Sequence, residues 1–169
     1  LEAKPMTIRV NRELVKSSDR STRHLELELP AGVSYRAGDH LGIIPHNSEG
    51  LVNRIISRFG FEKDSHIRLR RATNRKTFLP IDQAISVSQL LSDYVELQDV
   101  ATRSQIEILA DFTECPPHRI QLAALTGEDE NSASRYREEI LSKRKSVLDL
   151  LEEYPACAVP FEIYLEMLP

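Results

Sequence analysis

At residues 35–47 the chain reads Tyr35-Arg36-Ala37-Gly38-Asp39-His40-Leu41-Gly42-Ile43-Ile44-Pro45-His46-Asn47. Gly38 and Asp39 form a turn dipeptide, and a short apolar run follows at residues 41–44. Pro45 lacks an amide hydrogen, so it ends strand pairing at this point. Apolar residues recur with a period of two before this stretch and with a helical period after it. The stretch therefore predicts a change from strands to helices.

The strands are predicted from alternation of apolar and polar side chains. Residues 6–15 alternate at their start, and the run at residues 23–29 alternates leucine with glutamate. The apolar run at residues 41–44 adds a third strand. Three short strands before residue 46, joined by polar turns, indicate part of an antiparallel barrel or sandwich.

The helices are predicted from apolar spacing, capping residues and helix breakers. Ser86 and Thr102 each stand three residues before a glutamine, which is capping-box spacing. With strands first and helices afterwards, the fold class is α+β. In chain order, we expect a helix capped by Asn47 and ended by Gly60, helices after Ser86 and Thr102, a helix from about Pro117 to Gly127, a loop over residues 128–134, a long helix over about residues 134–153 stopped by Pro155, and a last helix started by Pro160.

The composition excludes several classes of protein. The 169 residues carry a formal net charge of −4, which gives no overall case for binding nucleic acid or a membrane surface. Apolar runs are only a few residues long, so we expect no membrane-spanning helix. Cys115 and Cys157 are few and far apart, which favours reduced thiols in a cytoplasmic protein over a disulfide.

Charge is unevenly distributed along the chain. An acidic stretch, residues 82–114, has seven acids and one cation, Arg103. It follows a basic segment, residues 54–76, which forms either a solvated face or a docking surface. The basic segment holds eight cations (Arg54, Arg58, Lys63, Arg68, Arg70, Arg71, Arg75 and Lys76) against Glu62 and Asp64.

The quoted stretch has the pattern Y-x-x-G-D-H-x-G-x-x-P-x-N and follows an R-H-L-E-L strand. It resembles the FAD and connecting-domain region of the diflavin reductases, which relay NADPH electrons through FAD and FMN to a haem protein. The resemblance spans nearly the whole chain and is strongest to the reductase half of the bacterial self-sufficient fatty-acid monooxygenases. Four further segments resemble the family in the same order: Thr102–Gln105, Cys115–His118, Tyr154–Cys157 and Glu166–Pro169.

The resemblance implies a fold and a function. Residues 1–46 would hold the first strands of the FAD-binding barrel, and residues 47–169 a helical connecting domain. The remaining barrel strands and the flavin-stacking R-x-Y-S segment would lie beyond Pro169. The chain would be a fragment of an NADPH–haemoprotein reductase that orients the flavin domains, with the FMN and haem domains as partners. It would form part of the FAD site, with no catalytic residue and no FAD held stably by the fragment alone.

Arg144 is the leading site residue. On the expected long helix it falls within an apolar stripe that includes Ile140, Val147 and Leu148. A guanidinium there needs a carboxylate partner, or its stem must extend to water. The resemblance implies a third role, contact with the FAD pyrophosphate, because the family places such an arginine ten residues before the Tyr-Pro pair. Arg137 ranks second.

Arg20 is the other site residue that the resemblance implies. It stands four residues before His24, where relatives place an arginine that touches the phosphates of the nicotinamide nucleotide. The residues alone predict a loop arginine in water, and the nearby Arg23 could be confused with it. Cys115 and His118 have ligand-like spacing but no second pair, so we expect no metal site. The alternative function is a stand-alone α+β interaction module that uses the basic segment.

Overall fold

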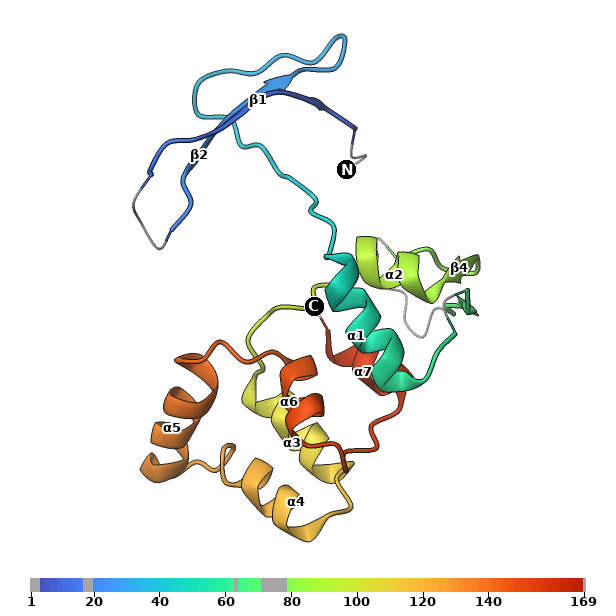
Figure 1. The fold of residues 1–169 in the computed structure, drawn as a ribbon, viewed down its shortest axis with the longest axis vertical. Helices are drawn as coiled ribbons and strands as arrows, with labels where there is room; N and C mark the ends of the chain where they lie inside the picture. The colour runs from blue at the N-terminus through green and yellow to red at the C-terminus, as the bar shows by residue number, and fades with distance from the viewer. Residues whose placement is uncertain (1–3, 17–19, 63, 71–78, 169) are drawn as a thin grey trace. The chain divides into compact units, whose positions relative to one another are not determined.

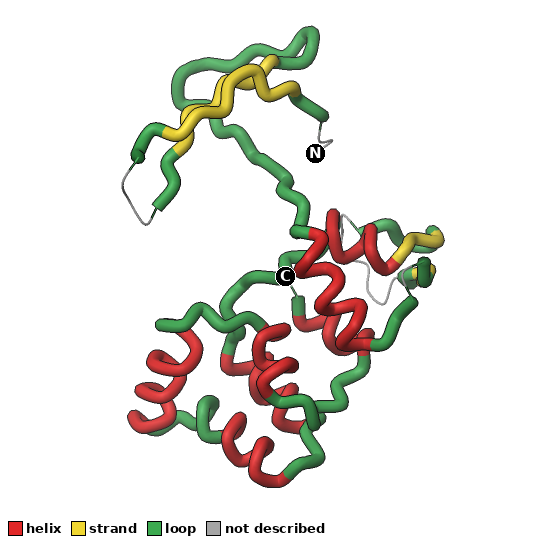
Figure 2. Tube along the Cα trace, in the orientation of Figure 1, coloured by secondary structure: helices red, strands yellow, loops and turns green. Residues whose placement is uncertain are grey.

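A computed structural model describes residues 4–16, 20–62, 64–70 and 79–168. The chain divides into two compact units, Leu1–Ile44 and Pro45–Pro169. The first unit contains a two-stranded hairpin, and the second contains the helices and a small second sheet (Figure 2). The α+β class expected from the sequence is confirmed.

The hairpin of the first unit pairs β1 (Thr7–Glu13) with β2 (Arg23–Glu28) in antiparallel register. The expected strand at residues 41–44 is wrong, because these residues form no strand in the described part of the chain. A strand needs a partner for its amides and carbonyls, and β1 and β2 pair only with each other among the described residues. Within the described part of this unit, no second layer covers their apolar side chains, so Ile8 of β1 is 54% exposed and Leu25 of β2 is 44% exposed.

The second unit begins with α1 (Glu49–Phe59), which ends at Gly60 as expected. The cap is Ser48, whose hydroxyl accepts from the Leu51 amide at 3.4 Å, so the prediction of Asn47 as the cap is wrong. The Asn47 amide instead donates to the Leu91 and Val95 carbonyls, each at 2.7 Å. Asn47 therefore satisfies carbonyls in and just after α2 (Val87–Asp93), which connects the start of α1 to that helix.

Two of the expected capping residues are confirmed. Ser86 caps α2 (Val87–Asp93), and Thr102 forms a full capping box at the start of α3 (Arg103–Asp111). The short strands β3 (His66–Arg68) and β4 (Ala84–Ser86) pair in antiparallel register immediately before α2. Proline occupies the first positions of α4 (Pro116–Ala123), where its missing amide hydrogen costs nothing.

The expected loop over residues 128–134 and the expected long helix over residues 134–153 are both wrong. The chain instead forms α5 (Glu130–Tyr136), the π-helical turn η1 (Arg137–Leu141) and α6 (Val147–Glu153), and α7 (Phe161–Met167) follows Pro160 as expected. Two capping residues set the actual boundaries, because each satisfies amides that a helix start leaves unpaired. Asp129 accepts from the Ser132 amide at 3.0 Å, and Ser146 forms a capping box with Asp149.

The core of the second unit takes buried side chains from η1 and from helices α1, α2, α3, α4, α6 and α7, whose arrangement Figure 1 shows. The described helices are all too short or too polar to cross a lipid bilayer. Among the most deeply buried side chains of the core are Ile55 of α1, Ile106 and Leu109 of α3, Leu148 and Leu151 of α6, and Tyr164 of α7.

Candidate functional site

Arg144 lies in the turn that joins η1 to α6, and its side chain is exposed. The expected position on an apolar helical stripe is therefore wrong. Ile140 is buried on η1, whereas Val147 and Leu148 are buried on α6, so no continuous helix carries all three. Within the described residues, the Arg144 guanidinium has neither a hydrogen-bond partner nor an ion-pair partner, which removes the buried-carboxylate alternative.

The backbone of Arg144 is left-handed, with φ of +50°. Its amide donates to the Leu141 carbonyl at 3.2 Å, and the next amide, that of Lys145, donates to the Ile140 carbonyl at 3.1 Å. These two bonds form a Schellman motif, which usually has glycine at the left-handed position. Gly60 takes that place in the same motif after α1, with φ of +70°. An L-residue there costs about 1–2 kcal/mol, so the turn carries an arginine at an energetic cost.

The turn is held in place from several sides. The Lys145 carbonyl accepts from the Ala101 amide at 2.9 Å, and Val100 forms an antiparallel bridge with Ser146. The Lys145 ammonium also forms an ion pair with Glu153 of α6. The two residues that precede Lys145 in the turn, Lys143 and Arg144, have exposed side chains. The turn therefore presents two cations on a fixed backbone, which suits an anionic group such as phosphate.

Arg137, the second-ranked residue, is exposed on η1 and lies outside this turn. The structure thus brings Arg144 together with Lys143 and leaves Arg137 on the preceding π-helical turn. Lys143 was missed as a neighbour because the sequence was interpreted as one long helix. The signal that could have revealed the turn is the S-x-x-D spacing of Ser146 and Asp149, a variant of the capping box.

Arg20 lies in the other compact unit, in the loop between β1 and β2, and its side chain is exposed. Glu13 organises this loop, because its carboxylate accepts from the Ser21 hydroxyl and, at 2.8 Å, from the Thr22 amide. The Ser21 hydrogen bond contributes most to holding the pKa of Glu13 below its usual value. Arg23 pairs with Glu13 at 3.4 Å and donates to the Asn11 side chain at 2.5 Å. Arg23 is therefore engaged within the hairpin.

The basic segment does not form one uniform patch. Arg54 forms ion pairs with α6, and Arg58 donates to the Leu151 carbonyl at 3.3 Å and to the Cys157 carbonyl. Arg68 and Arg70 are exposed. The remaining four cations of the segment, Lys63, Arg71, Arg75 and Lys76, lie outside the described residues.

The two cysteines are free, as expected, with Cys157 buried and Cys115 partly buried. The His118 ring packs edge-on against the Tyr154 ring, with 5.4 Å between the ring centroids. Within the described ranges, no group of three or more histidine, cysteine, aspartate or glutamate side chains is arranged to hold a metal ion.

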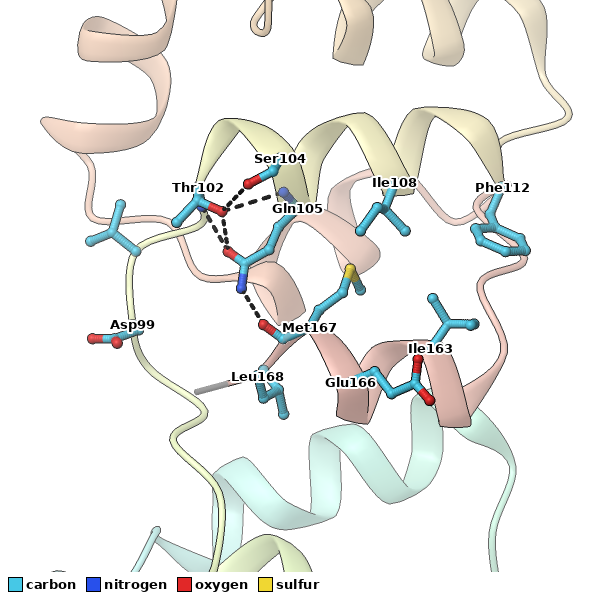
Figure 3. Close-up of a pocket in the computed structure, with 11 residues that line it drawn as sticks. Asp99, Thr102, Ser104, Gln105, Ile108, Phe112, Ile163, Glu166, Met167 and Leu168 are labelled. Carbon is cyan, nitrogen blue, oxygen red and sulfur yellow. Dashed lines mark hydrogen bonds between the residues drawn. The ribbon is translucent and has the colours of Figure 1, made fainter. Parts of the chain in front are cut away.

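A groove of about 700 Å³ runs between α3 and α7 (Figure 3). The Gln105 side chain lies at its polar end, where it accepts from the Thr102 amide and donates to the Met167 carbonyl, both at 2.7 Å. These polar groups are therefore satisfied within the fold. Two carboxylates, Asp99 and Glu166, also line the groove and would repel phosphate. The groove is thus a poor match for a nucleotide, and the turn at Arg144 remains the better candidate.

Comparison with known proteins gives consistent matches along the chain. A family model described as "FAD binding domain" matches residues 2–169. The chain is 49% identical over 160 residues to the bifunctional cytochrome P450/NADPH–P450 reductase 2 of Bacillus subtilis, covering 94% of the chain and 15% of that protein. It is 48% identical over 169 residues to the corresponding bifunctional protein of Bacillus cereus, covering 99% of the chain and 15% of that protein.

A more distant relative comes from a fungus. The bifunctional cytochrome P450/NADPH–P450 reductase of Fusarium oxysporum is 39% identical over 160 residues, covering 95% of the chain and 14% of that protein. The chain therefore spans about 15% of the length of the curated relatives that it matches.

Proposed function

The chain belongs to the FAD-binding domain family, and from this premise we propose that it is part of an NADPH-dependent diflavin reductase. In this proposal the complete reductase passes electrons from NADPH to FAD, then to FMN, and then to a haem monooxygenase. The observation that carries the proposal is the match of residues 2–169 to the family, together with nearly full coverage of the chain by the bifunctional reductases. Both agree with the resemblance seen in the motifs at residues 35–47, 102–105, 115–118, 154–157 and 166–169.

The two compact units have separate roles in this proposal. The hairpin of the first unit supplies the first strands of the FAD-binding barrel. Its exposed apolar side chains, such as Ile8 and Leu25, support this role, because further barrel strands would cover them. The helical second unit is the connecting domain, which orients the flavin domains relative to each other. The alternative of a stand-alone interaction module has no comparable support, because two cations of the basic segment are engaged within the fold.

Arg144 is the residue that we propose for the FAD pyrophosphate. Its guanidinium has no partner among the described residues and stands on an anchored turn. It fits an anionic diphosphate, because arginine binds phosphate oxygens through a planar fork of donors. Bound FAD would supply the chemistry, accepting a hydride and releasing electrons one at a time. The role of this chain would be to bind and orient the cofactor, and Arg20 would contact the phosphates of NADPH.

The proposed partners are the FMN and haem domains of the same polypeptide. The basic segment would attract an acidic FMN domain through its exposed cations Arg68 and Arg70. The free thiols of Cys115 and Cys157 suit the cytoplasmic location that we propose.

The test is flavin binding by the chain alone and by a longer polypeptide. We expect the 169-residue chain to be colourless and to bind FAD negligibly, because a two-stranded hairpin leaves the barrel open. A polypeptide extended through the remaining barrel should bind FAD stoichiometrically, and the complete reductase should reduce cytochrome c with NADPH. Flavin fluorescence titration and absorbance measure these properties. Stoichiometric FAD on the chain alone would contradict the proposed division, and a complete protein without NADPH-dependent reduction would contradict the function.

A second prediction concerns Arg20. We expect Arg20→Ala in the complete reductase to leave both flavins bound and to raise the KM for NADPH by about three- to tenfold at low salt, the size expected for one exposed phosphate contact. Steady-state cytochrome c reduction measures this effect. Arg12→Ala is the matched control, because Arg12 is an exposed cation on β1 of the same hairpin, outside the loop. Equal KM values for the Arg20 variant and the wild type would remove Arg20 from the nucleotide site.

A further inference from the structure

Arg54 of α1 bridges two carboxylates of α6, Asp149 in its first turn and Glu152 near its end, through charge-assisted hydrogen bonds. Its Nε donates to Glu152 Oε1 at 2.9 Å, and its Nη2 donates to Glu152 Oε2 at 2.7 Å and to Asp149 Oδ1 at 2.8 Å. The side chains of Arg54, Asp149 and Glu152 are each about 40% exposed. The bidentate bonds to Glu152 can stabilise the packing of α1 on α6, whereas the bond to Asp149 also reaches the residue that caps α6.

The Asp149 carboxylate divides its two oxygens between α1 and the turn. Oδ1 accepts from Arg54, whereas Oδ2 accepts from the Ser146 amide at 2.9 Å and from the Ser146 hydroxyl at 2.7 Å. Ser146 is the cap of α6 and stands two residues after Arg144. An arginine on α1 is therefore connected through a single carboxylate to the turn that carries Arg144.

The charge state of Asp149 suits this connection. Burial alone raises its pKa, but the Ser146 amide, the Arg54 guanidinium and the Ser146 hydroxyl together hold the pKa below its usual value. The carboxylate is therefore ionised at neutral pH, where it can accept from both partners at once.

We propose that Arg54 is a positioning residue for Arg144, which it orients toward the anion by fixing Asp149 and hence the capping box at Ser146. This inference rests on the proposed function, in which Arg144 contacts the FAD pyrophosphate. A phosphate contact depends on the direction of the guanidinium, so a backbone held at Ser146 limits the angles that Arg144 can adopt. The bonds of Lys145 to Ala101 and Glu153 restrain the same turn. Loss of Arg54 should therefore weaken the contact between Arg144 and the pyrophosphate without abolishing it.

Arg58 provides a matched control on the same helix. Its Nε donates to the Leu151 carbonyl at 3.3 Å, and its Nη2 donates to the Cys157 carbonyl. Arg58 thus also links α1 to α6 and the segment that follows, but it bonds backbone carbonyls there and makes no bond to Asp149 or Ser146. If α1 contributes only general stability, Arg54→Ala and Arg58→Ala should affect FAD binding equally.

The experiment is a double-mutant cycle in the complete reductase, with FAD dissociation constants measured after flavin removal. We expect Arg54→Ala to weaken FAD binding by about three- to tenfold when Arg144 is present, and by less than about twofold in the Arg144→Ala background. Arg54→Lys should restore part of the affinity, because one ammonium can still pair with Asp149. Arg58→Ala should change the dissociation constant by less than about twofold.

The outcomes separate this inference from the proposed function. If Arg144→Ala leaves FAD affinity unchanged, the assignment of Arg144 fails, and the role of Arg54 fails with it. If Arg144→Ala weakens binding but Arg54→Ala has the same effect in both backgrounds, only the positioning role is overturned. If Arg54→Ala does not fold, Arg54→Lys completes the cycle, and equal effects of this variant with and without Arg144 overturn the role in the same way.

Discussion

Replacing Arg144 with alanine in the complete reductase is expected to weaken FAD binding by about ten- to a hundredfold, while FMN stays bound. One charge-assisted contact to phosphate is worth about 1.5–3 kcal/mol, which corresponds to this range of affinity. The Arg144 guanidinium forms no hydrogen bond or ion pair within the described part of the chain, so its removal should break no internal contact. Release and quantification of both flavins, followed by FAD titration, measure the effect.

Two further variants make this prediction specific. Lys143→Ala removes the neighbouring exposed cation and should weaken FAD binding by less than about threefold, because a flexible ammonium lacks the planar fork of arginine. Arg144→Gly should lose as much FAD affinity as Arg144→Ala. It should also raise the free energy of unfolding by about 0.5–1 kcal/mol, because glycine adopts the left-handed backbone at φ of +50° without strain.

The combination of lost affinity and gained stability is the decisive result for Arg144. A residue kept at an unfavourable backbone position for a ligand should show both changes in the glycine variant. Equal FAD content and equal dissociation constants for Arg144→Ala and the wild type would exclude the assignment. A glycine variant that unfolds more easily than the wild type would show that the arginine side chain stabilises the turn itself.

Helix boundaries set by local hydrogen bonds could be predicted from the sequence. Ser86 and Thr102 cap their helices, and Gly60 ends α1, because these residues satisfy backbone groups within a few positions of themselves. The cap of α1 was misplaced by one residue, since Asn47 and Ser48 can both cap a helix. The choice between them depends on the carbonyls of the distant residues Leu91 and Val95, which the sequence pattern does not reveal.

The turn at Arg144 could not be predicted from apolar spacing. Ile140, Val147 and Leu148 keep a helical period and are all buried, but they lie on η1 and α6 with a left-handed residue between them. A break of this kind is usually signalled by glycine, and here the position holds arginine. The family resemblance identified Arg144 as a candidate, although the surroundings expected for it were wrong.

The strand expected at residues 41–44 failed for a different reason. Alternation and apolar runs predict that a segment can pair, but pairing requires a neighbouring strand at the right place. In the described part of the first unit, β1 and β2 use each other as partners. Ile43 and Ile44 are both about 65% exposed, so the hairpin does not bury the apolar side chains that predicted a strand here.

Replacing Tyr164 with phenylalanine is expected to raise the free energy of unfolding of the chain by about 1–2 kcal/mol. Tyr164 of α7 is fully buried, and its ring packs against Phe59 at 5.0 Å between centroids and against Phe161 at 6.3 Å. Its hydroxyl is buried without a hydrogen-bond partner among the described residues. Removing an unsatisfied buried hydroxyl recovers its desolvation cost, about 1–3 kcal/mol, while the ring contacts remain.

The charges around Tyr164 support this expectation. Burial raises the pKa of its hydroxyl, Arg54 opposes the change and Asp149 adds to it. The hydroxyl is therefore neutral at neutral pH, so its cost comes from desolvation and not from ionisation. Urea unfolding of the chain at neutral pH, followed by circular dichroism, measures the difference between the variant and the wild type.

The same substitution at Tyr136 should change the free energy of unfolding in the opposite direction. The Tyr136 hydroxyl is only partly buried and donates to the Ala101 carbonyl at 2.8 Å. Tyr136→Phe deletes that bond and leaves the carbonyl without its side-chain donor, which should lower the free energy of unfolding by about 0.5–1.5 kcal/mol. The two variants remove the same atom, so differences in ring size or composition cannot explain opposite signs. If Tyr164→Phe destabilises the chain as much as Tyr136→Phe does, the Tyr164 hydroxyl has a partner, such as a buried water, and its unsatisfied state is disproved.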